Sequence, residues 1–267
     1  LKQNAAPRDI PLEDDKIYVA MVMSDGDNLN TWFAFFYEHY FSDPRFREVP
    51  LGFGIGPAAF DAIPGAVSYY YSQAGPMHEF ISDVSGIGYI QPDNYANVFT
   101  DREKLLGLFL DWTDRYLRHM DMNTLRTVGG TDDTLRHYVD RVGRMEFLFA
   151  DMGRYSGRSG IENLTYDLDG MPVFRAATTW SHGNEGYLPE LLEQVGEQRP
   201  AFVNGFVHCW TWPSLDSILT HIVEPAPDHV VFVTPTELNN LRAEHLRRQK
   251  TANETAGEAR PAETQSR

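Results

Sequence analysis

Short apolar runs alternate with helix-like segments along nearly the whole chain, and this alternation most constrains the fold. The first run, KIYVAMVM at residues 16–23, is almost continuous, as in a strand buried on both faces. The other expected strands cover residues 50–57, 79–82, 124–129, 146–151, 201–210 and 229–233. Strands that alternate with helices predict an α/β fold with a mainly parallel sheet.

One segment departs from this alternation. LTYDLDGMPVFRA, residues 164–176, places an Asp169-Gly170 turn between two alternating runs, which is the pattern of a β-hairpin. With seven or eight strands and helices of similar weight, we expect a closed or nearly closed, irregular (β/α) barrel with this hairpin inserted. An open doubly wound sheet is the alternative.

The segment DREKLLGLFLDWTDRYLRHM, residues 101–120, is the clearest helix. Its large apolar residues recur every three to four positions, so we expect them to form one buried stripe. The expected stripe consists of Leu105, Leu108, Phe109, Trp112, Tyr116 and Leu117.

Length and composition predict one large domain. The chain has 267 residues with 42% hydrophobic content, enough for a full core. We expect an extension at residues 1–15, the α/β barrel domain at 16–248, and a disordered tail at 249–267, which has no large apolar residue. The chain begins without an initiator Met or a signal peptide, so we expect a mature form or a piece of something longer.

The charge of the chain limits the classes of partner that it can bind, and its cysteine content limits its disulfides. The 38 acidic and 23 basic residues give a net charge of −15, which opposes binding to nucleic acids and anionic membranes. No run approaches the length of a membrane span. Cys209 is the only cysteine, which excludes an intrachain disulfide and leaves the compartment open. The expected partner is a carbohydrate or another small neutral ligand.

Ligands of both architectures bind at the carboxyl ends of the strands. We therefore examine the polar and aromatic residues that come directly after the predicted strands. These candidates are Asp25, Asp27, Asn28, Asp83, Tyr89, Asp151, Trp180, His182, Glu185, His208 and Trp210.

Asp25 and Asp27 give the strongest signal among them. An acidic pair across a glycine, at a strand end and before a helix, can act as acid and base or bind a hard cation such as calcium or magnesium. We favour the metal-free version, because no further acidic cluster is adjacent in sequence. The plainer alternative is that Asp27 or Asn28 only caps the following helix.

The remaining candidates fit a sugar site. Asp151 or Glu185 would supply the second carboxyl group that glycoside hydrolysis requires. His182 and His208 could bind or protonate a sugar, although a lone histidine is more often structural. The rings of Tyr89, Trp180 and Trp210 could pack on sugar faces, and packing within the core is the alternative for each. Zinc-type Cys-His spacing is absent from the sequence.

The segment SGIGYIQP resembles the signature of the GxGYxYP glycoside hydrolase family, in its C-terminal domain. Gly86, Gly88, Tyr89 and Pro92 match the motif, whereas Gln91 stands where the motif has its second tyrosine. VMSDGDNLN and HVVFVTPTEL are similar to other segments of that domain, and the similarity runs from about Lys16 to Leu241.

The resemblance implies an extracellular or periplasmic sugar-processing domain, in which the Gly86 to Pro92 loop forms one wall of the site and its glycines let the backbone approach the ligand. It also implies a separate N-terminal domain of the same protein, since family members usually have one. Two other functions stay open. One is Asp-x-Asp phosphoryl transfer of the haloacid dehalogenase type, in which GGTDDT would supply magnesium carboxylates; it lacks a suitable lysine, because Lys104 lies on the clear helix. The other is a sugar-binding domain without catalysis.

Overall fold

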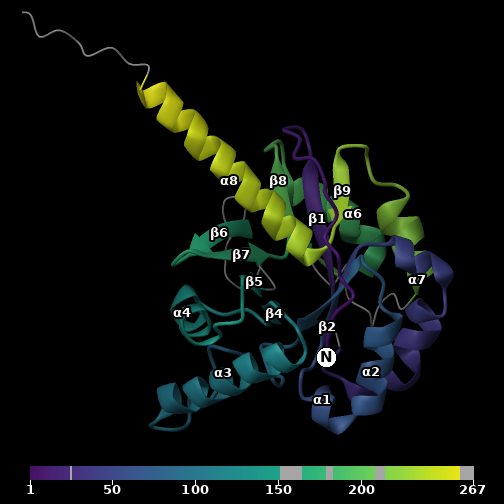
Figure 1. Cartoon of the computed structure of the whole chain (residues 1–267), viewed down its shortest axis with the longest axis vertical. Coiled ribbons are helices and arrows are strands. Elements are labelled where there is room, and N and C mark those ends of the chain that lie inside the picture. The colour runs from purple at the N-terminus through teal and green to yellow at the C-terminus, as the bar shows by residue number, and fades with distance from the viewer. Residues whose placement is uncertain (25, 151–163, 179–182, 208–213, 259–267) are drawn as a thin grey trace, which may run out of the picture.

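The computed structural model describes residues 1–24, 26–150, 164–178, 183–207 and 214–258, and in this part of the chain nine strands form a single sheet (Figure 1). The strands are β1 (Ile17–Met23), β2 (Leu51–Ile55), β3 (His78–Ser82), β4 (Thr124–Thr127), β5 (Phe147–Ala150), β6 (Thr165–Leu168), β7 (Met171–Arg175), β8 (Ala201–Val207) and β9 (Val230–Val233). Their order is β6-β7-β5-β4-β3-β2-β1-β8, with β9 paired to β1.

Helices connect most of these strands, as the alternation predicts. The α-helices are α1 (Ala59–Ala62), α2 (Pro64–Gln73), α3 (Arg102–His119), α4 (Asp132–Arg141), α6 (Gly183–Val195), α7 (Leu215–Ile218) and α8 (Pro235–Glu258). The segments Thr31–Phe35, Tyr37–Phe41 and Leu219–Val223 are π-helical, and Pro44–Glu48 is a 3₁₀-helix. The aromatic helix expected after β1 is therefore present in a wider form, with Trp32, Phe36 and Tyr40 buried.

Every strand pair is parallel except β6 and β7. Those two strands form the predicted hairpin, whose turn residues Asp169 and Gly170 both have positive φ (50° and 88°). A turn with two positive φ angles suits the twist of a two-residue hairpin, and glycine adopts this conformation without strain.

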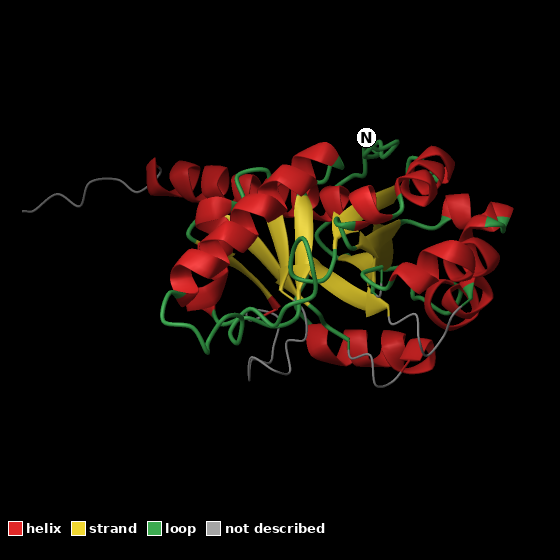
Figure 2. Cartoon of the chain, turned by 90° about the horizontal axis from the view of Figure 1, so that it is seen from below, coloured by secondary structure: helices red, strands yellow, loops and turns green. Residues whose placement is uncertain are grey.

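The sheet is strongly curled (Figure 2). Three strands separate β4 from β8 in the sheet order, yet the guanidinium carbon of Arg126 on β4 lies 4.9 Å from the ring centre of Phe206 on β8. Beyond the end of β7, the chain meets β8 through the isolated bridge between Ala176 and Asn204 and through hydrogen bonds of Ala177 and Thr178 to β8. The fold is thus a mixed α/β fold whose mostly parallel sheet curls into a half-barrel, so the closed or nearly closed, irregular (β/α) barrel that we expected is confirmed only in part.

The two faces of the curled sheet pack against different partners. Alternate residues of β1 separate them: Val19 and Met21 join a large outer cluster with the helices, whereas Tyr18 and Ala20 join an inner cluster. The inner cluster includes residues of β3, β5, β7 and β8, and it is completed by Leu238 of α8. The inner face is therefore a second core, and polar residues on it are buried between strands.

The first turn of α8 is held to the inner face by Glu79 of β3. The Glu79 carboxyl group accepts hydrogen bonds from the hydroxyl of Thr234 (2.5 Å) and from the amide and hydroxyl of Thr236 (both 2.9 Å). Thr234 and Glu237 form a capping box, in which each backbone amide donates to the side chain of the other residue. Arg8 of the N-terminal extension binds Glu237 through Nε and Nη2, both at 2.8 Å.

The buried face of α3 differs from the predicted stripe. The helix buries Leu106, Gly107, Leu110, Thr113 and Leu117, whereas Leu108 and Trp112 are 49% and 50% exposed. The small residues explain the difference. A Cβ atom on Gly107 would lie 2.9 Å from the Arg141 guanidinium, and the Thr113 hydroxyl lies 2.5 Å from the position of a Cβ on Gly86. The face of α3 with small residues is therefore the buried one, because it can approach its neighbours closely. Trp112 lies on the exposed face, where the guanidinium carbon of Arg115 is 4.9 Å from its ring centre.

The C-terminal boundary also differs from the prediction. We expected disorder from residue 249, but α8 continues to Glu258, and its last turns project away from the sheet (Figure 1). Residues 249–255 are exposed. Local effects therefore maintain the helix here, including pairs four residues apart such as Lys250 with Glu254 (4.0 Å).

Burial raises the pKa of Glu79 from its usual 4.5 to about 7, against the opposing effect of its hydrogen bonds. The folded protein therefore favours the protonated acid. This contribution to stability is complete below pH 4.5 and is lost as the pH rises through about 7. The substitution Glu79→Gln removes the ionisation. We expect the melting temperature of the variant minus that of wild type to rise by about a few degrees as the pH increases from about 5 to 8.

The comparison is made as a difference between variant and wild type. His78, whose pKa burial lowers to about 4, acts in the opposite direction and cancels in that difference. A melting-temperature difference that stays constant over this pH range would show that folding does not raise the pKa of Glu79.

Candidate functional site

The carboxyl ends of β1, β2 and β3 meet around Gly56. A Cβ atom on Gly56 would lie 3.1 Å from the Cα atom of Asp27 and 3.4 Å from the carbonyl oxygen of Asp83. The loop after β1 is fixed here, because the Gly26 carbonyl accepts hydrogen bonds from the amide of Gly56 (2.9 Å) and the indole of Trp32 (2.8 Å). Asp27 and Asp83 therefore flank the same glycine at this edge of the sheet.

Asp83 forms an ion pair with Arg126 on the inner face. The Arg126 Nε donates to Oδ1 of Asp83 at 2.7 Å, and the two side chains are only 3% and 0% exposed. A Cβ atom on Gly54 would lie 2.8 Å from Oδ2 of Asp83, so glycine on β2 makes room for this carboxylate. The Arg126 guanidinium is further held against the ring of Phe206. The result is a carboxylate in a fixed position, which is a requirement for binding or catalysis.

Asn204 carries a third polar side chain on this face. It lies at the middle of β8 and is fully buried. Within the described part of the chain, neither Nδ2 nor Oδ1 of Asn204 has a hydrogen-bond partner. Its partners on the neighbouring strands are Ala20 and Ala176.

A second buried arginine lies on the outer face. The Arg175 side chain is 1% exposed, and its Nη2 donates to the hydroxyl of Tyr166 at 2.9 Å. That hydroxyl donates to Asp132 at 2.8 Å, and burial raises the pKa of Tyr166. Nε and Nη1 of Arg175 have no hydrogen-bond partner among the described residues. The cluster connects the hairpin to the first turn of α4.

The loop with the glycine motif packs on α3. Gly86 has a φ of 126°, and a side chain on it would collide with Thr113, whose hydroxyl also accepts a hydrogen bond from the amide of Ile87 (3.1 Å). A Cβ atom on Gly88 would meet no atom within 4 Å. Tyr89 is 61% exposed. Helix packing thus accounts for Gly86, and the expected contact of Gly88 and Tyr89 with a ligand remains a prediction.

Several predicted site residues lie beyond what the structure describes. Asp25, Asp151, Trp180, His182, His208 and Trp210 are outside the described residues. Glu185 lies near the start of α6, and its side chain is outside the description. Asp27 and Asn28 are half-buried after β1. The predicted convergence of strand-end residues is therefore observed for Asp27 and Asp83 and remains a prediction for the others.

Arg126 and Asn204 were missed in the sequence. Each stands in a short strand that otherwise reads as buried: TLRT for β4 and AFVNGFV for β8. A charged or amide side chain inside an apolar run must be paired, or it must serve a function, because burying it alone is costly. That rule could have identified both residues, since it needs only the expected strands.

No group of three or more His, Cys, Asp or Glu side chains in the described ranges is placed to hold a metal ion. Asp25 is outside those ranges, so a cation site at Asp25 and Asp27 stays a prediction. None of the described helices combines the length and apolarity that a membrane crossing requires.

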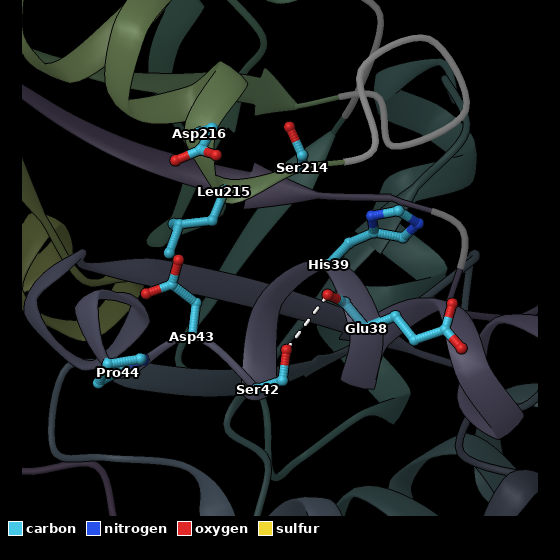
Figure 3. Close-up of a pocket in the computed structure, with 8 residues that line it drawn as sticks. All are labelled: Glu38, His39, Ser42, Asp43, Pro44, Ser214, Leu215 and Asp216. Atoms are coloured by element: carbon cyan, nitrogen blue, oxygen red, sulfur yellow. Dashed lines mark hydrogen bonds between the residues drawn. The ribbon is translucent and has the colours of Figure 1, made fainter.

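A depression of about 480 Å³ lies between the helical segment after β1 and α7 (Figure 3). Its lining residues are Glu38, His39, Ser42, Asp43, Pro44, Ser214, Leu215 and Asp216. Arg45 neutralises part of its negative charge, because Nη2 of Arg45 contacts Asp43 (2.6 Å) and Asp216 (2.5 Å). Its carboxylates are thus paired with an arginine or exposed, unlike the buried Asp83 on the inner face.

The model of the "GxGYxYP putative glycoside hydrolase C-terminal domain" matches residues 15–243. The chain belongs to the GxGYxYP family. The match covers the curled sheet and the first turns of α8, and it confirms the resemblance seen in the motif loop. No curated protein matches the sequence of this GxGYxYP domain significantly.

A solved structure shares the fold of this chain. A putative hydrolase from Bacteroides thetaiotaomicron is 22% identical with a TM-score of 0.72, over 90% of this chain and 48% of that one. The GxGYxYP domain therefore spans about half the length of that protein. A peptidoglycan deacetylase from Bacillus subtilis is 11% identical with a TM-score of 0.44, over 90% of this chain and 99% of that one. So low a score does not establish a shared fold.

The substitution Asp83→Asn leaves the charge of Arg126 buried without its carboxylate. Breaking a buried ion pair on one side costs about 3–5 kcal/mol. We therefore expect Asp83→Asn to lower the free energy of unfolding by about this amount in denaturant titration. The control is Asp140→Asn, at an exposed position of α4, which we expect to change stability by about 0.5 kcal/mol or less. Equal effects of the two substitutions would mean that the ion pair does not support the fold.

Proposed function

We propose that this GxGYxYP domain is a carbohydrate-active hydrolase that binds a neutral sugar at the carboxyl edge of the curled sheet. One observation carries the proposal: Asp27 and Asp83 approach the same glycine at this edge, Gly56, through the Cα atom of Asp27 and the carbonyl oxygen of Asp83, and Arg126 fixes the Asp83 carboxylate. Family membership supports a hydrolase. The net charge of −15 supports a substrate that is not an anion.

The two carboxylates suit different tasks. Glycoside hydrolysis requires one carboxyl group that gives a proton to the leaving oxygen and one that acts as nucleophile or base. Asp83 is buried against a guanidinium, which fits a charged carboxylate held in place. Asp27 is half-buried in the loop after β1, where it can reach a bound sugar and exchange protons. Asp25, Asp151 and Glu185 remain proposed partners of this pair.

Phosphoryl transfer receives less support. That chemistry needs a lysine beside the phosphate in addition to the first Asp-x-Asp segment. Lys104 is the only lysine between the two acidic segments, and it is exposed on α3. The family match gives no support to this alternative either.

The test is an oligosaccharide panel scored for both binding and release of reducing ends. We expect wild type to cleave one class of glycan and Asp27→Asn to lower the rate by about 10²–10⁴-fold, the usual contribution of a general acid or base. Affinity should change little, and the matched control Asp140→Asn should behave as wild type. Cleavage that does not depend on Asp27 would contradict the proposed role, and binding without cleavage by wild type would establish a non-catalytic sugar-binding domain.

Chelation distinguishes a metal-free site from one that holds a divalent cation. We propose that hydrolysis needs no divalent cation, so EDTA should leave both the cleavage rate and the melting temperature unchanged. Loss of both on chelation, with recovery on adding calcium or magnesium, would instead place a hard cation at Asp25 and Asp27.

A further inference from the structure

The amide of Asn204 is an unusual group to bury. Its side chain is fully buried, and in the described part of the chain neither amide atom has a hydrogen-bond partner. Burial of an amide without partners destabilises a protein, so such groups are rare in native structures and call for an explanation. Asn204 therefore lowers the stability of the folded protein, and a role in ligand binding would explain why it is present.

Register places the Asn204 side chain on the inner face. Its neighbour Val203 belongs to the outer cluster, and side chains alternate along a strand. Phe202 and Phe206 thus share the inner face with Asn204. Phe202 stacks on Tyr18 with ring centres 5.6 Å apart, away from the carboxyl edge. Phe206 lies beneath Arg126 at that edge. Asn204 therefore lies one inward-facing position further from the carboxyl edge than Phe206, the residue of β8 that contacts the ion pair.

Small residues flank the amide on both sides. Asn204 pairs with Ala20 on β1, and it forms the isolated bridge with Ala176 after β7. Neither neighbour has a side chain long enough to cover the amide or a polar group to bind it. The nearby Thr178 hydroxyl is already engaged, because it contacts both the amide (3.1 Å) and the carbonyl (3.2 Å) of Phe206.

We propose that Asn204 is a ligand-binding residue, whose carboxamide binds a sugar through a hydrogen-bond donor and an acceptor on neighbouring atoms. An uncharged amide offers both functions side by side. Two groups of a neutral sugar have this chemistry: a pair of vicinal hydroxyls and an acetamido group. The proposal rests on the proposed function, since it places a recognition group at the same site.

The decisive variant is Asn204→Leu, because leucine has the branched shape of asparagine without its polar atoms. If the amide has no role in the fold of the ligand-free protein, an apolar side chain fits the buried position better than the amide does. We then expect the melting temperature of the variant to exceed that of wild type by about 2–4 °C. Binding should weaken about ten- to a hundredfold, the effect of losing two hydrogen bonds. The probes are methyl α-glucoside and N-acetylglucosamine, titrated by calorimetry, which distinguish hydroxyl from acetamido recognition.

Tyr187→Phe is the matched control. The Tyr187 hydroxyl of α6 is also buried without a partner in the described residues, but it packs on Gly205 from the outer face. Its removal should not reduce stability, and it should leave binding of both sugars unchanged. Asn204→Ala removes the amide without adding bulk, and it replaces the leucine variant in the binding measurement if that variant does not fold.

Three results would overturn the proposal. A lower melting temperature of Asn204→Leu would show that the amide supports the fold, for example through a buried water. Unchanged affinity in the variant would show that the amide does not contact the sugar, and so would the absence of binding of either probe to wild type at millimolar concentration. Failure of the proposed function alone would give a different result: a probe sugar would bind wild type and lose affinity in the Asn204 variant, while no glycan is cleaved.

Discussion

Asp83 and Arg126 face each other inside the curled sheet, where both side chains are almost inaccessible to solvent. Removing two charges from water is so costly that they must remain together once the sheet has formed. The pair also spans a short pairing within the sheet, since β3 and β4 share only the register pair between Ser82 and Leu125. The ion pair thus joins β3 to β4, and through Phe206 it joins β4 to the opposite side of the curl.

The same ion pair explains why polar chemistry collects on the inner face. Glycine at position 54 of β2 leaves space for the Asp83 carboxylate, and Gly56 lets the loops after β1 and β3 come together. The inner face thus carries a carboxylate, a guanidinium and an amide among residues that are mostly aromatic and aliphatic. A site with fixed polar groups above an apolar floor can orient a sugar by hydrogen bonds and exclude water around it.

Much of the fold could be predicted from the sequence, because period and burial are local signals. The nearly continuous apolar run of β1 and the Asp169-Gly170 turn identified a buried strand and a hairpin correctly. The degree of closure could not be predicted, since it depends on how the segment after β7 meets β8 around the bridge of Ala176 with Asn204. The buried face of α3 was misjudged for a similar reason: Gly107 and Thr113 allow close approach, which a count of large apolar residues does not detect.

The candidate site was partly predictable. Asp27 and Asp83 were found because they follow strands, and parallel strands present their carboxyl ends at one edge. Arg126 and Asn204 were not found, although each is a polar side chain inside an expected buried strand; the ion pair of Arg126 and the unpaired amide of Asn204 appear only in three dimensions. Asp151, His208 and Trp210 are equally strong strand-end candidates, and they lie outside the described residues.

The most direct measurement is a crystal structure of the protein with the tightest-binding oligosaccharide of the panel. The account predicts a sugar ring at the carboxyl edge, with one group within hydrogen-bond distance of the Asn204 amide and another between Asp27 and Asp83. A sugar bound only on the exposed face of Trp112, or only in the depression beside His39, would contradict it.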